Sequence, residues 1–291
     1  MPPIYINDGD FAPLHGKVVL ITGGSSGIGL ATAQLLLEHQ ALVVVADRQP
    51  IISNDSSPSP GKSPTFVQAD VTSWEDLTKA FQLTIDKFGR IDHIFANAGI
   101  SSPVNSIVDD VLDEQGALKE PDLKVLQVNL IGVVNTIKLA IHHLRKQQHP
   151  GSIVITASTA AYQQFSSVDY TTSKHAVLGL MRGLAGHLHP HLPIRINAIA
   201  PSWTATGIIP RSAVEAAGVA IQEPSAVART VALLMADEAR NQQLIYSNEG
   251  RFAEIETDLL AEADRLRPKE SSEEEDFQKI LLVIRKPQSA T

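Results

Sequence analysis

The stretch KVVLITGGSSGIG, residues 17–29, joins an apolar, β-branched run to a turn rich in glycine and serine. Such a run is typical of a strand buried on both faces of a parallel sheet, and residues 27–39 have helical spacing. Gly23, Gly27 and Gly29 allow a tight turn and a close approach of the backbone to a ligand. The helix start adds unpaired N–H groups and the positive end of the helix dipole. The stretch therefore predicts a phosphate-binding turn between the first strand and helix; an ordinary glycine–serine turn is the alternative.

Strand-like and helical segments continue to alternate along the chain. Further apolar, β-branched runs occupy residues 41–48, 65–71, 93–99, 152–158, 194–202 and 243–250. Segments with helical spacing lie between them, at 73–88, 121–147, 170–189 and 224–240. This alternation predicts right-handed crossovers and a parallel sheet. We expect an α/β fold in which residues 1–256 form a single Rossmann-like, doubly wound domain, with about seven parallel strands and helices on both faces of the sheet.

Four segments interrupt the alternation. Residues 49–64 are rich in Ser, Pro, Asn and Gly, which predicts a flexible surface loop. Residues 207–224 mix Pro and Gly with apolar side chains after the sixth strand, which predicts a substrate lid. Residues 101–120 are irregular. Residues 257–291 form a C-terminal tail extension whose apolar patch at 280–284 we expect to pack on the body or on a second subunit; its flanks are not strongly basic, which disfavours a membrane-surface role.

Composition narrows the class of protein. Of the 291 residues, 43% are hydrophobic, enough for a sizeable core, and the formal net charge is −8 without a basic block. This charge pattern does not predict a basic surface that would bind nucleic acid. The absence of cysteine excludes disulfides, thiol nucleophiles and thiolate metal sites. No apolar run approaches the ~20 residues of a membrane-spanning helix. The N-terminus lacks the pattern of a signal peptide, so we expect a soluble cytoplasmic protein without a membrane partner.

Acidic residues at the ends of the second and third strands indicate the ligand. Asp47 can accept hydrogen bonds from the ribose hydroxyls of an adenosine and would repel a 2′-phosphate, which favours NAD(H). Arg48 could pair with that phosphate, so NADP(H) remains the alternative. Asp70 is placed to accept from an adenine amino group, or it caps the following helix. The backbone of residues 97–99 could lie flat against the adenine ribose.

Three further side chains supply a candidate for acid–base chemistry. Ser158 ends the fifth strand, and Tyr170 and Lys174 share one face of a helix. A positive charge within ~4–6 Å lowers the pKa of a tyrosine by one to three units. Lys174 would thus make Tyr170 a usable general acid or base, while Ser158 holds a substrate oxygen. Tyr-x-x-x-Lys alone is more often a surface pair, but with Ser158 and the glycine turn it favours a proton-transfer partner for hydride chemistry. No His, Asp or Glu set has a metal-ligand pattern, so we expect no metal site.

Together these residues resemble the short-chain dehydrogenase/reductase family. Thr22–Gly29 match its T-G-x-x-x-G-x-G motif, and Asn97–Gly99 match its N-A-G. Tyr170–Lys174 match its Y-x-x-x-K, and Ser158 matches its upstream serine. The motifs occur in the family's order, and the resemblance covers residues 14–250. The C-terminal part is similar to members from filamentous fungi that act on cyclic natural products.

The resemblance implies further roles. Asn129 would support a proton path through a water bonded to Lys174. Residues 201–206 match the family's P-G-x-x-x-T, which contacts the nicotinamide carboxamide, except that Ser202 replaces the usual glycine. Members are commonly dimers or tetramers, which implies a homodimer or homotetramer here.

The catalytic candidates are therefore Asn129, Ser158, Tyr170 and Lys174. The cofactor-binding candidates are Gly23, Ser25, Ser26, Gly27, Ile28, Gly29, Asp47, Arg48, Asp70, Val71, Asn97, Ala98, Gly99, Tyr170, Lys174, Pro201, Trp203 and Thr206. The candidates for an apolar substrate pocket are Phe165, Trp203, Ile208 and Ile209. We expect an NAD(P)(H)-dependent oxidoreductase that interconverts a hydrophobic, cyclic secondary alcohol and its ketone. The alternatives are an NADPH-dependent biosynthetic ketoreductase, a cofactor-assisted cyclase or isomerase, and a non-catalytic dinucleotide-binding protein.

Overall fold

A computed structural model of the chain describes residues 2–51, 63–147, 149–266 and 273–284. The chain divides into two units, residues 1–255 and residues 256–291. The first unit holds the sheet and all the candidate site residues. The second holds two helices, α8 (Glu256–Leu266) and α9 (Glu273–Ile284).

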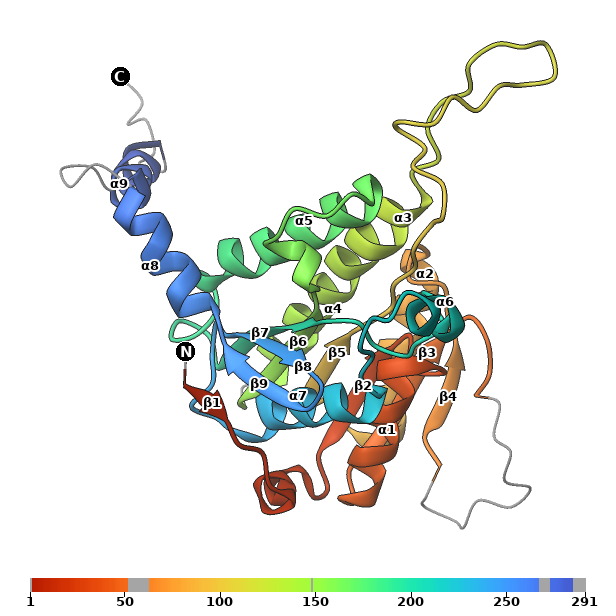
Figure 1. Cartoon of the computed structure of the whole chain (residues 1–291). Helices are drawn as coiled ribbons and strands as arrows, with labels where there is room; N and C mark the ends of the chain where they lie inside the picture. The colour runs from red at the N-terminus through yellow and green to blue at the C-terminus, as the bar shows by residue number, and fades with distance from the viewer. Residues whose placement is uncertain (1, 52–62, 148, 267–272, 285–291) are drawn as a thin grey trace. The chain divides into compact units, whose positions relative to one another are not determined.

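The predicted parallel sheet is confirmed, and its strands are the seven apolar runs (Figure 1). In spatial order these strands are β4 (Thr65–Gln68), β3 (Leu42–Asp47), β2 (Val18–Thr22), β5 (His93–Ala96), β6 (Gly151–Thr156), β7 (Ile194–Pro201) and β8 (Leu244–Asn248). All neighbours in this series pair in parallel. The chain reverses its direction of progress across the sheet between β2 and β5, and open α/β sheets bind ligands at the carboxyl ends of strands beside such a point.

Two antiparallel strands extend the sheet beyond the prediction. β9 (Arg251–Glu254) pairs with β8, and β1 (Pro3–Ile4) pairs with β9. Glu249 and Gly250 connect β8 to β9 with φ values of 50° and 75°, which suit a two-residue hairpin turn of the I′ type. The sequence therefore contains a turn signal for β9 that the alternation of strands and helices obscured. β1 has only two residues, which is too short for a strand to be recognised from sequence.

Helices cover both faces of the sheet (Figure 1). On one face α1 and α7 pack against each other, and the 3-10 helix η1 packs on α7. On the other face α2 contacts α4, α4 contacts β5 and β6, and α5 contacts β7. The bounds are η1 (Asp8–Leu14), α1 (Gly27–Glu38), α2 (Trp74–Phe88), α4 (Gly132–Gln147), α5 (Val168–Ala185) and α7 (Pro224–Ala236).

Apolar side chains of the strands fill both layers between sheet and helices. Val19, Ile21 and Phe95 belong to the core cluster that also contains residues of α1 and α7. Leu20 and Ile94 are fully buried as well, and they point to the opposite face because successive side chains of a strand alternate. Each such side chain stabilises the fold by about 1.5–3 kcal/mol when fully buried. Burial on both faces is the reason that these runs are apolar at every position.

The predicted helices are present, with local differences at their ends. The helix predicted at 170–189 begins at Val168 and ends at Ala185, with Gly186 at its C-cap. The helix predicted at 224–240 ends at Ala236, because Asp237 leaves the helical conformation with ψ of 103°. The helix predicted at 121–147 begins with the short helix α3 (Lys124–Leu126) and continues through one π-helical turn, η2 (Gln127–Ile131), into α4.

This composite helix corrects one expectation. Residues 124–147 are long and apolar enough to cross a membrane by length and composition, although the sequence was expected to contain no such segment. Half of the apolar stretch is buried inside the fold, and α4 packs on β5 and β6. The segment is apolar because it is a core helix of the fold.

The interrupting segments have different structures. Residues 52–62 lie outside the described part of the chain, so the flexible loop there stays a prediction. Residues 207–224 contain helix α6 (Arg211–Ala216). Residues 101–123 form an arm that projects from the body and carries a short antiparallel hairpin, in which Leu112 lies opposite Leu118 (Figure 1). The patch at 280–284 ends α9, and its packing partner stays a prediction.

A buried histidine lies at the start of β5. The Nδ1 atom of His93 is 2.8 Å from Ser152 Oγ on β6, while its Nε2 is buried without a hydrogen-bond partner in the described structure. Burial lowers the pKa of His93 to about 3; the charge of Asp92 opposes this shift, whereas Arg195 and Lys17 add to it. His93 is therefore neutral over the physiological range.

We expect this neutral histidine to weaken the fold in acid. In the unfolded chain His93 takes up a proton near its ordinary pKa of 6.5, whereas the folded protein resists protonation down to about pH 3. The unfolded state then binds more protons, so stability falls as pH decreases through this window, by about 2.5 kcal/mol between pH 7 and 4.5 from this group. Urea unfolding at a series of pH values should show a smaller acid loss for His93→Gln than for wild type. The exposed His187→Gln is the control, and equal acid slopes for wild type and His93→Gln would contradict the expectation.

Candidate active site

The turn between β2 and α1 is built so tightly that it excludes side chains. Gly23 has a φ of +67°, and a Cβ there would lie 2.6 Å from the Ala98 Cα atom. A Cβ on Gly29 would lie 2.2 Å from the Gly23 carbonyl oxygen. Gly27 has a φ of +52° and faces Thr206, where a Cβ would meet the threonine Cβ at 3.0 Å. The turn thus requires glycine at all three positions and leaves its backbone open to a ligand.

A groove of about 200 Å³ lies at the carboxyl ends of the strands beside this turn. Thirteen of the predicted cofactor-binding residues line it: Gly23, Ser26, Gly27, Ile28, Asp47, Arg48, Asp70, Val71, Asn97, Ala98, Gly99, Lys174 and Thr206. Five do not, namely Ser25, Gly29, Tyr170, Pro201 and Trp203. Six lining residues were not predicted: Ala46, Ala69, Ile100, Val128, Thr156 and Ile208, the last predicted only for the substrate pocket. Several of these six residues directly neighbour predicted cofactor-binding residues. Extending the prediction to every residue at each strand end would have found them.

Two carboxylates lie along the groove. Asp47 accepts hydrogen bonds from the backbone N–H groups of Ser25 at 3.0 Å and Gln49 at 3.2 Å. Asp70 Oδ2 lies 3.6 Å from Arg48 Nε. Burial tends to raise the pKa of Asp70, but hydrogen bonds from Thr72 and the nearby Arg48 charge outweigh it and leave the pKa below its ordinary value. Asp70 is therefore a charged acceptor.

The following helix does not use Asp70 as its cap. Ser73 is the N-cap residue of α2, and its hydroxyl accepts from the Asp76 N–H at 3.2 Å. Asp70 instead accepts from the Thr72 N–H and hydroxyl at 2.9 and 2.7 Å through one carboxylate oxygen. The helix-cap alternative for Asp70 is thus wrong, and its other oxygen faces Arg48.

The groove fits a dinucleotide. Its glycines form a cradle that a Cβ would fill, and the hydroxyl of Ser25 is buried without a hydrogen-bond partner in the described structure. Open N–H groups at the start of α1 and charged acceptors at the ends of β3 and β4 match pyrophosphate and adenosine, respectively.

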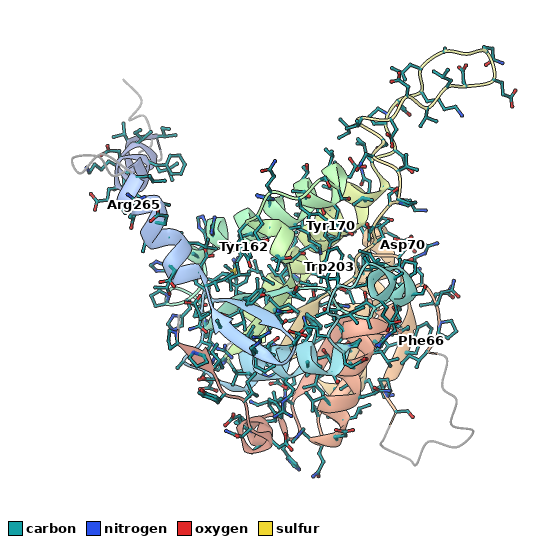
Figure 2. All side chains as sticks on the ribbon, in the orientation of Figure 1. Phe66, Asp70, Tyr162, Tyr170, Trp203 and Arg265 are labelled. Carbon is teal, nitrogen blue, oxygen red and sulfur yellow. The ribbon has the colours of Figure 1, made fainter. Side chains whose placement is uncertain are left out.

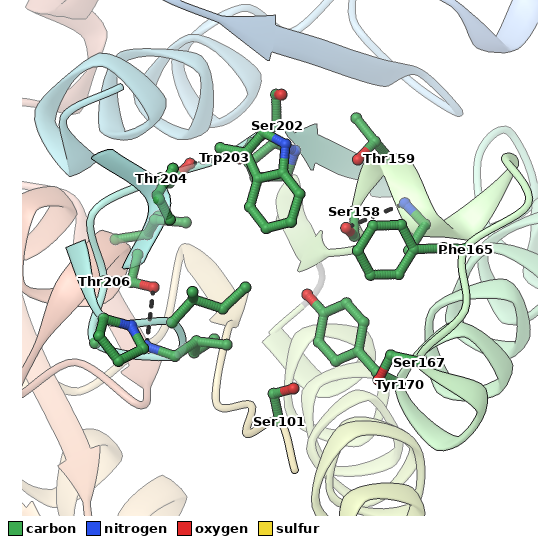
Figure 3. Close-up of a pocket in the computed structure, with 18 of the residues that line it drawn as sticks. Ser101, Ser158, Thr159, Phe165, Ser167, Tyr170, Ser202, Trp203, Thr204 and Thr206 are labelled. Atoms are coloured by element: carbon green, nitrogen blue, oxygen red, sulfur yellow. Dashed lines mark hydrogen bonds between the residues drawn. The ribbon is translucent and has the colours of Figure 1, made fainter. Parts of the chain in front are cut away.

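The three acid–base candidates come together beside the groove. Ser158 follows β6 at the N-cap of a short 3-10 helix, η3 (Thr159–Ala161), and its hydroxyl accepts from the Ala160 N–H at 3.2 Å. The Ser158 side chain is near enough to the phenol of Tyr170 to favour its charged form. One turn along α5, Lys174 Nζ lies 5.4 Å from the centroid of the Tyr170 ring and donates to the Thr156 carbonyl at 2.8 Å. Figure 3 shows the Tyr170 hydroxyl pointing into the cavity on the side of Ser158.

The expected electrostatics of this pair need correction. Burial raises the pKa of the Tyr170 phenol, and the nearby Ser158 hydroxyl opposes that shift only in part. Burial also lowers the pKa of Lys174 to about 8. The sequence predicted that Lys174 lowers the tyrosine pKa, but its ammonium is turned to the Thr156 carbonyl and is itself desolvated. In this structure the phenol is therefore firmly protonated.

Asn129 lies in the π-helical turn η2 and is completely buried. Its Oδ1 accepts from the Ile100 N–H at 2.8 Å, and its Nδ2 donates to the Ile100 carbonyl at 2.9 Å and to Ser173 Oγ at 3.3 Å. The side chain thus ties the loop after β5 to helix α5. π-Helical turns inside α-helices are frequent at functional sites.

A larger cavity of about 640 Å³ adjoins the groove. It contains all four predicted substrate-pocket residues, Phe165, Trp203, Ile208 and Ile209, together with Ser158, Tyr170 and Pro201. Gly207, Pro210 and Val214 of the segment predicted as a lid, 207–224, also line it. Residues that were not predicted line it too: Ser101, Ser102, Pro103, Ala157, Thr159, Ala160, Ser167 and Thr204. None of the lining side chains is charged, and hydroxyls supply nearly all of their polar atoms.

Two aromatic rings form one wall of this cavity. The ring centroids of Phe165 and Trp203 are 5.9 Å apart at an angle of 51° (Figure 3). Tyr170 and Trp203 lie close together on the body of the molecule, with Asp70 farther along the same side (Figure 2). Ile28, Thr206 and Ile208 line both the cavity and the groove, so the two spaces are continuous.

Comparisons with known proteins agree with this geometry. The profile of the family described as short chain dehydrogenase matches residues 17–216. The chain is 44% identical over 267 residues to the short-chain dehydrogenase/reductase ascJ of Acremonium egyptiacum, an alignment that covers 90% of this chain and 88% of that protein. It is 36% identical over 249 residues to momilactone A synthase of Oryza sativa subsp. japonica, with coverage of 84% and 88%. The solved structure of levodione reductase superposes with a TM-score of 0.66 and 26% identity, over 81% of this chain and 97% of that one.

The family read from the motifs and its likeness to a fungal member are thereby confirmed. The glycine turn, the paired Tyr170 and Lys174 and the upstream Ser158 occupy one continuous site in the matched region. The chain belongs to the short-chain dehydrogenase/reductase family of NAD(P)(H)-binding oxidoreductases.

Proposed function

We propose that the protein interconverts a hydrophobic, cyclic secondary alcohol and its ketone, with NAD(H) as the preferred cofactor. The observation that carries this proposal is the position of the Tyr170 hydroxyl. It lies on the side of Ser158 (Figure 3) and opens on an uncharged cavity that is continuous with the dinucleotide groove.

The residues divide the chemistry between them. A bound nicotinamide cofactor supplies or accepts the hydride. Ser158 holds the substrate oxygen and orients it toward Tyr170. Because burial keeps the Tyr170 phenol protonated, it can donate its proton to a ketone oxygen and recover that proton in the reverse direction. Lys174 lines the groove beside Tyr170 and would hold the cofactor ribose, while Asn129 supports the proton path by fixing the loop after β5.

The cavity supports the substrate class. Charged substrates would lose their hydration without gaining a charged partner, since no lining side chain carries charge. A volume of about 640 Å³ is within the usual range for small-molecule sites. The face of Trp203 and the side chain of Phe165 offer flat apolar surfaces suited to a ring. The relative named momilactone A synthase supports a role in natural-product metabolism. We propose a cytoplasmic location and a homodimer or homotetramer.

The first test is turnover on a panel of apolar cyclic alcohols and ketones, followed by the change in nicotinamide absorbance. We expect Tyr170→Phe to reduce kcat on any accepted substrate by about 10²–10⁴-fold, because the proton donor is lost. NADH affinity, measured by cofactor fluorescence, should be nearly unchanged. Near-normal kcat in Tyr170→Phe would contradict the assigned role, and turnover without any absorbance change would favour a cyclase or isomerase.

The cofactor preference rests on Asp47. We expect NADH to bind at least about tenfold more tightly than NADPH, a difference of about 1.4 kcal/mol, because a 2′-phosphate would meet this carboxylate. Asp47→Ala should remove most of that preference in fluorescence titrations. Arg48→Ala is the matched control and should preserve it, since Arg48 faces Asp70. Tighter NADPH binding by wild type, lost in Arg48→Ala, would instead support an NADPH-dependent ketoreductase.

The buried ammonium of Lys174 should lower the free energy of unfolding, although the proposed reaction needs this residue. Its pKa falls from 10.5 to about 8 on burial, so between these values the folded state binds fewer protons than the unfolded state, and stability rises with pH. At pH 7 the buried charge is at its full cost, and Lys174→Met should stabilise the protein by about 2 kcal/mol while abolishing turnover. Urea unfolding measures the change, with the exposed Lys146→Met as control. A destabilised Lys174→Met variant would show that the buried ammonium contributes to the fold.

A further inference from the structure

Gln222 is a buried polar side chain that the proposed reaction does not use. It lies near the end of the segment predicted as a lid, is only 3% exposed and is not among the residues that line the substrate cavity. Its Oε1 atom is buried without a hydrogen-bond partner in the described structure. Burying an amide with an unsatisfied acceptor costs free energy, which a methionine of similar volume would avoid. The amide therefore needs an explanation beyond filling space.

The backbone of Gln222 joins the two ends of the segment that follows β7. Its N–H donates to the Trp203 carbonyl at 2.9 Å, and its carbonyl accepts from the Ala205 N–H at 3.0 Å. Thr204 and Gln222 thus pair as an isolated parallel bridge. The intervening residues 206–221 therefore start and end at one point of the fold, beside Trp203.

The side chain of Gln222 fastens this point to the sheet. Its Nε2 atom donates to the carbonyl of Ser247 on β8 at 3.0 Å, and it lies 3.3 Å from the Ser247 hydroxyl. The same Nε2 lies 3.2 Å from the Thr204 hydroxyl, which in turn donates to the Ser202 carbonyl at 2.7 Å. One amide group thus connects the end of β8 with the chain on both sides of Trp203.

Trp203 depends on this support because the core does not hold its ring. The residue is 36% exposed, and its aromatic neighbour Phe165 is itself 38% exposed. The two rings form one wall of the substrate cavity (Figure 3). A side chain with few buried contacts is positioned mainly by its backbone. The orientation of the Trp203 ring therefore follows from the backbone that Gln222 holds in place.

We propose that Gln222 is a positioning residue that sets the specificity of the site for flat, ring-shaped substrates. By holding the Trp203 backbone against β8, it keeps the Trp203 and Phe165 rings in an arrangement that suits a flat ring. The inference rests on the reaction proposed above and identifies the part of the chain that selects among ketones. Gln222 lines neither the cofactor groove nor the cavity, so its effect falls on substrate binding rather than on proton transfer.

The first test compares the kinetics of wild type and Gln222→Met. Methionine keeps the volume and both backbone hydrogen bonds but removes the Nε2 donor, and the Ser247 carbonyl still accepts from the Ser202 N–H at 2.9 Å. With NADH and the flat bicyclic ketone β-tetralone, KM should rise at least about tenfold while kcat changes little, because ring binding is weakened and proton transfer is not. KM for methyl octyl ketone, an open-chain ketone with the same number of carbon atoms, should be nearly unchanged.

Gln147→Met is the matched control for a loss of stability alone. Gln147 ends α4, and its amide accepts from the Ile91 N–H at 2.7 Å and donates to the Ile91 carbonyl at 2.8 Å, but it does not line the cavity. Urea unfolding should show this variant to be less stable than wild type, with KM unchanged for both ketones. An unchanged KM for β-tetralone in Gln222→Met, or an equal rise for both ketones, would overturn the specificity role.

Tryptophan fluorescence supplies a readout that does not depend on turnover. The chain contains two tryptophans, and Trp74→Phe removes the other one, on α2, so that Trp203 reports alone. In cofactor-free protein, acrylamide should quench Trp203 at least about twofold more strongly in Gln222→Met, because the wall is less firmly held. Unchanged quenching would overturn the positioning role whatever the kinetics show. A wild type that turns over neither ketone would count against the proposed reaction, and the quenching result would still decide the role of Gln222.

Discussion

The close contact between the Gly23 backbone and Ala98 is the constraint on which the site depends. It leaves no room for a side chain, so the end of β2 lies directly against the loop after β5. The same turn places the Gly29 backbone against the Gly23 carbonyl and the Ser25 N–H on Asp47. Strand ends that are distant in sequence are thereby held around one open groove. A Cβ at any of these glycines would both separate β2 from β5 and close the groove.

Burial then sets the chemistry of the polar side chains that face this groove. Tyr170 is partly buried and Lys174 is buried, which keeps the phenol protonated and makes the ammonium easier to deprotonate. Both pKa shifts disfavour the charged forms, phenolate and ammonium. Burying these two groups therefore costs free energy that an apolar core would not cost. The Thr156 carbonyl holds the Lys174 ammonium in place. An uncharged cavity beside them suits a neutral carbonyl or hydroxyl, whose oxygen becomes the only polar group that needs a partner.

The segments added to the sheet have separate tasks. The chain after β7 contributes Trp203, Thr206 and Ile208, and these meet the glycine turn where groove and cavity join. The loop after β5 contributes the other wall and then continues into the acidic arm. Asn129 ties this loop to α5 from within a π-helical turn. Substrate recognition would therefore depend on one short stretch of backbone.

The sequence by itself determined the class of fold and most of the groove. Seven apolar runs separated by helical segments permit only a parallel sheet, and glycines or acids at the strand ends are local signals that survive without knowledge of the fold. It missed β1 and β9, two short strands at one end of the sheet, and the residues of the cavity at 101–103 and 159. It also predicted a lowered pKa for Tyr170, whereas burial raises it. Those features depend on which surfaces exclude water and which distant segments meet. Only the tertiary structure decides them, because desolvation and cavity shape are properties of packing rather than of any stretch of sequence.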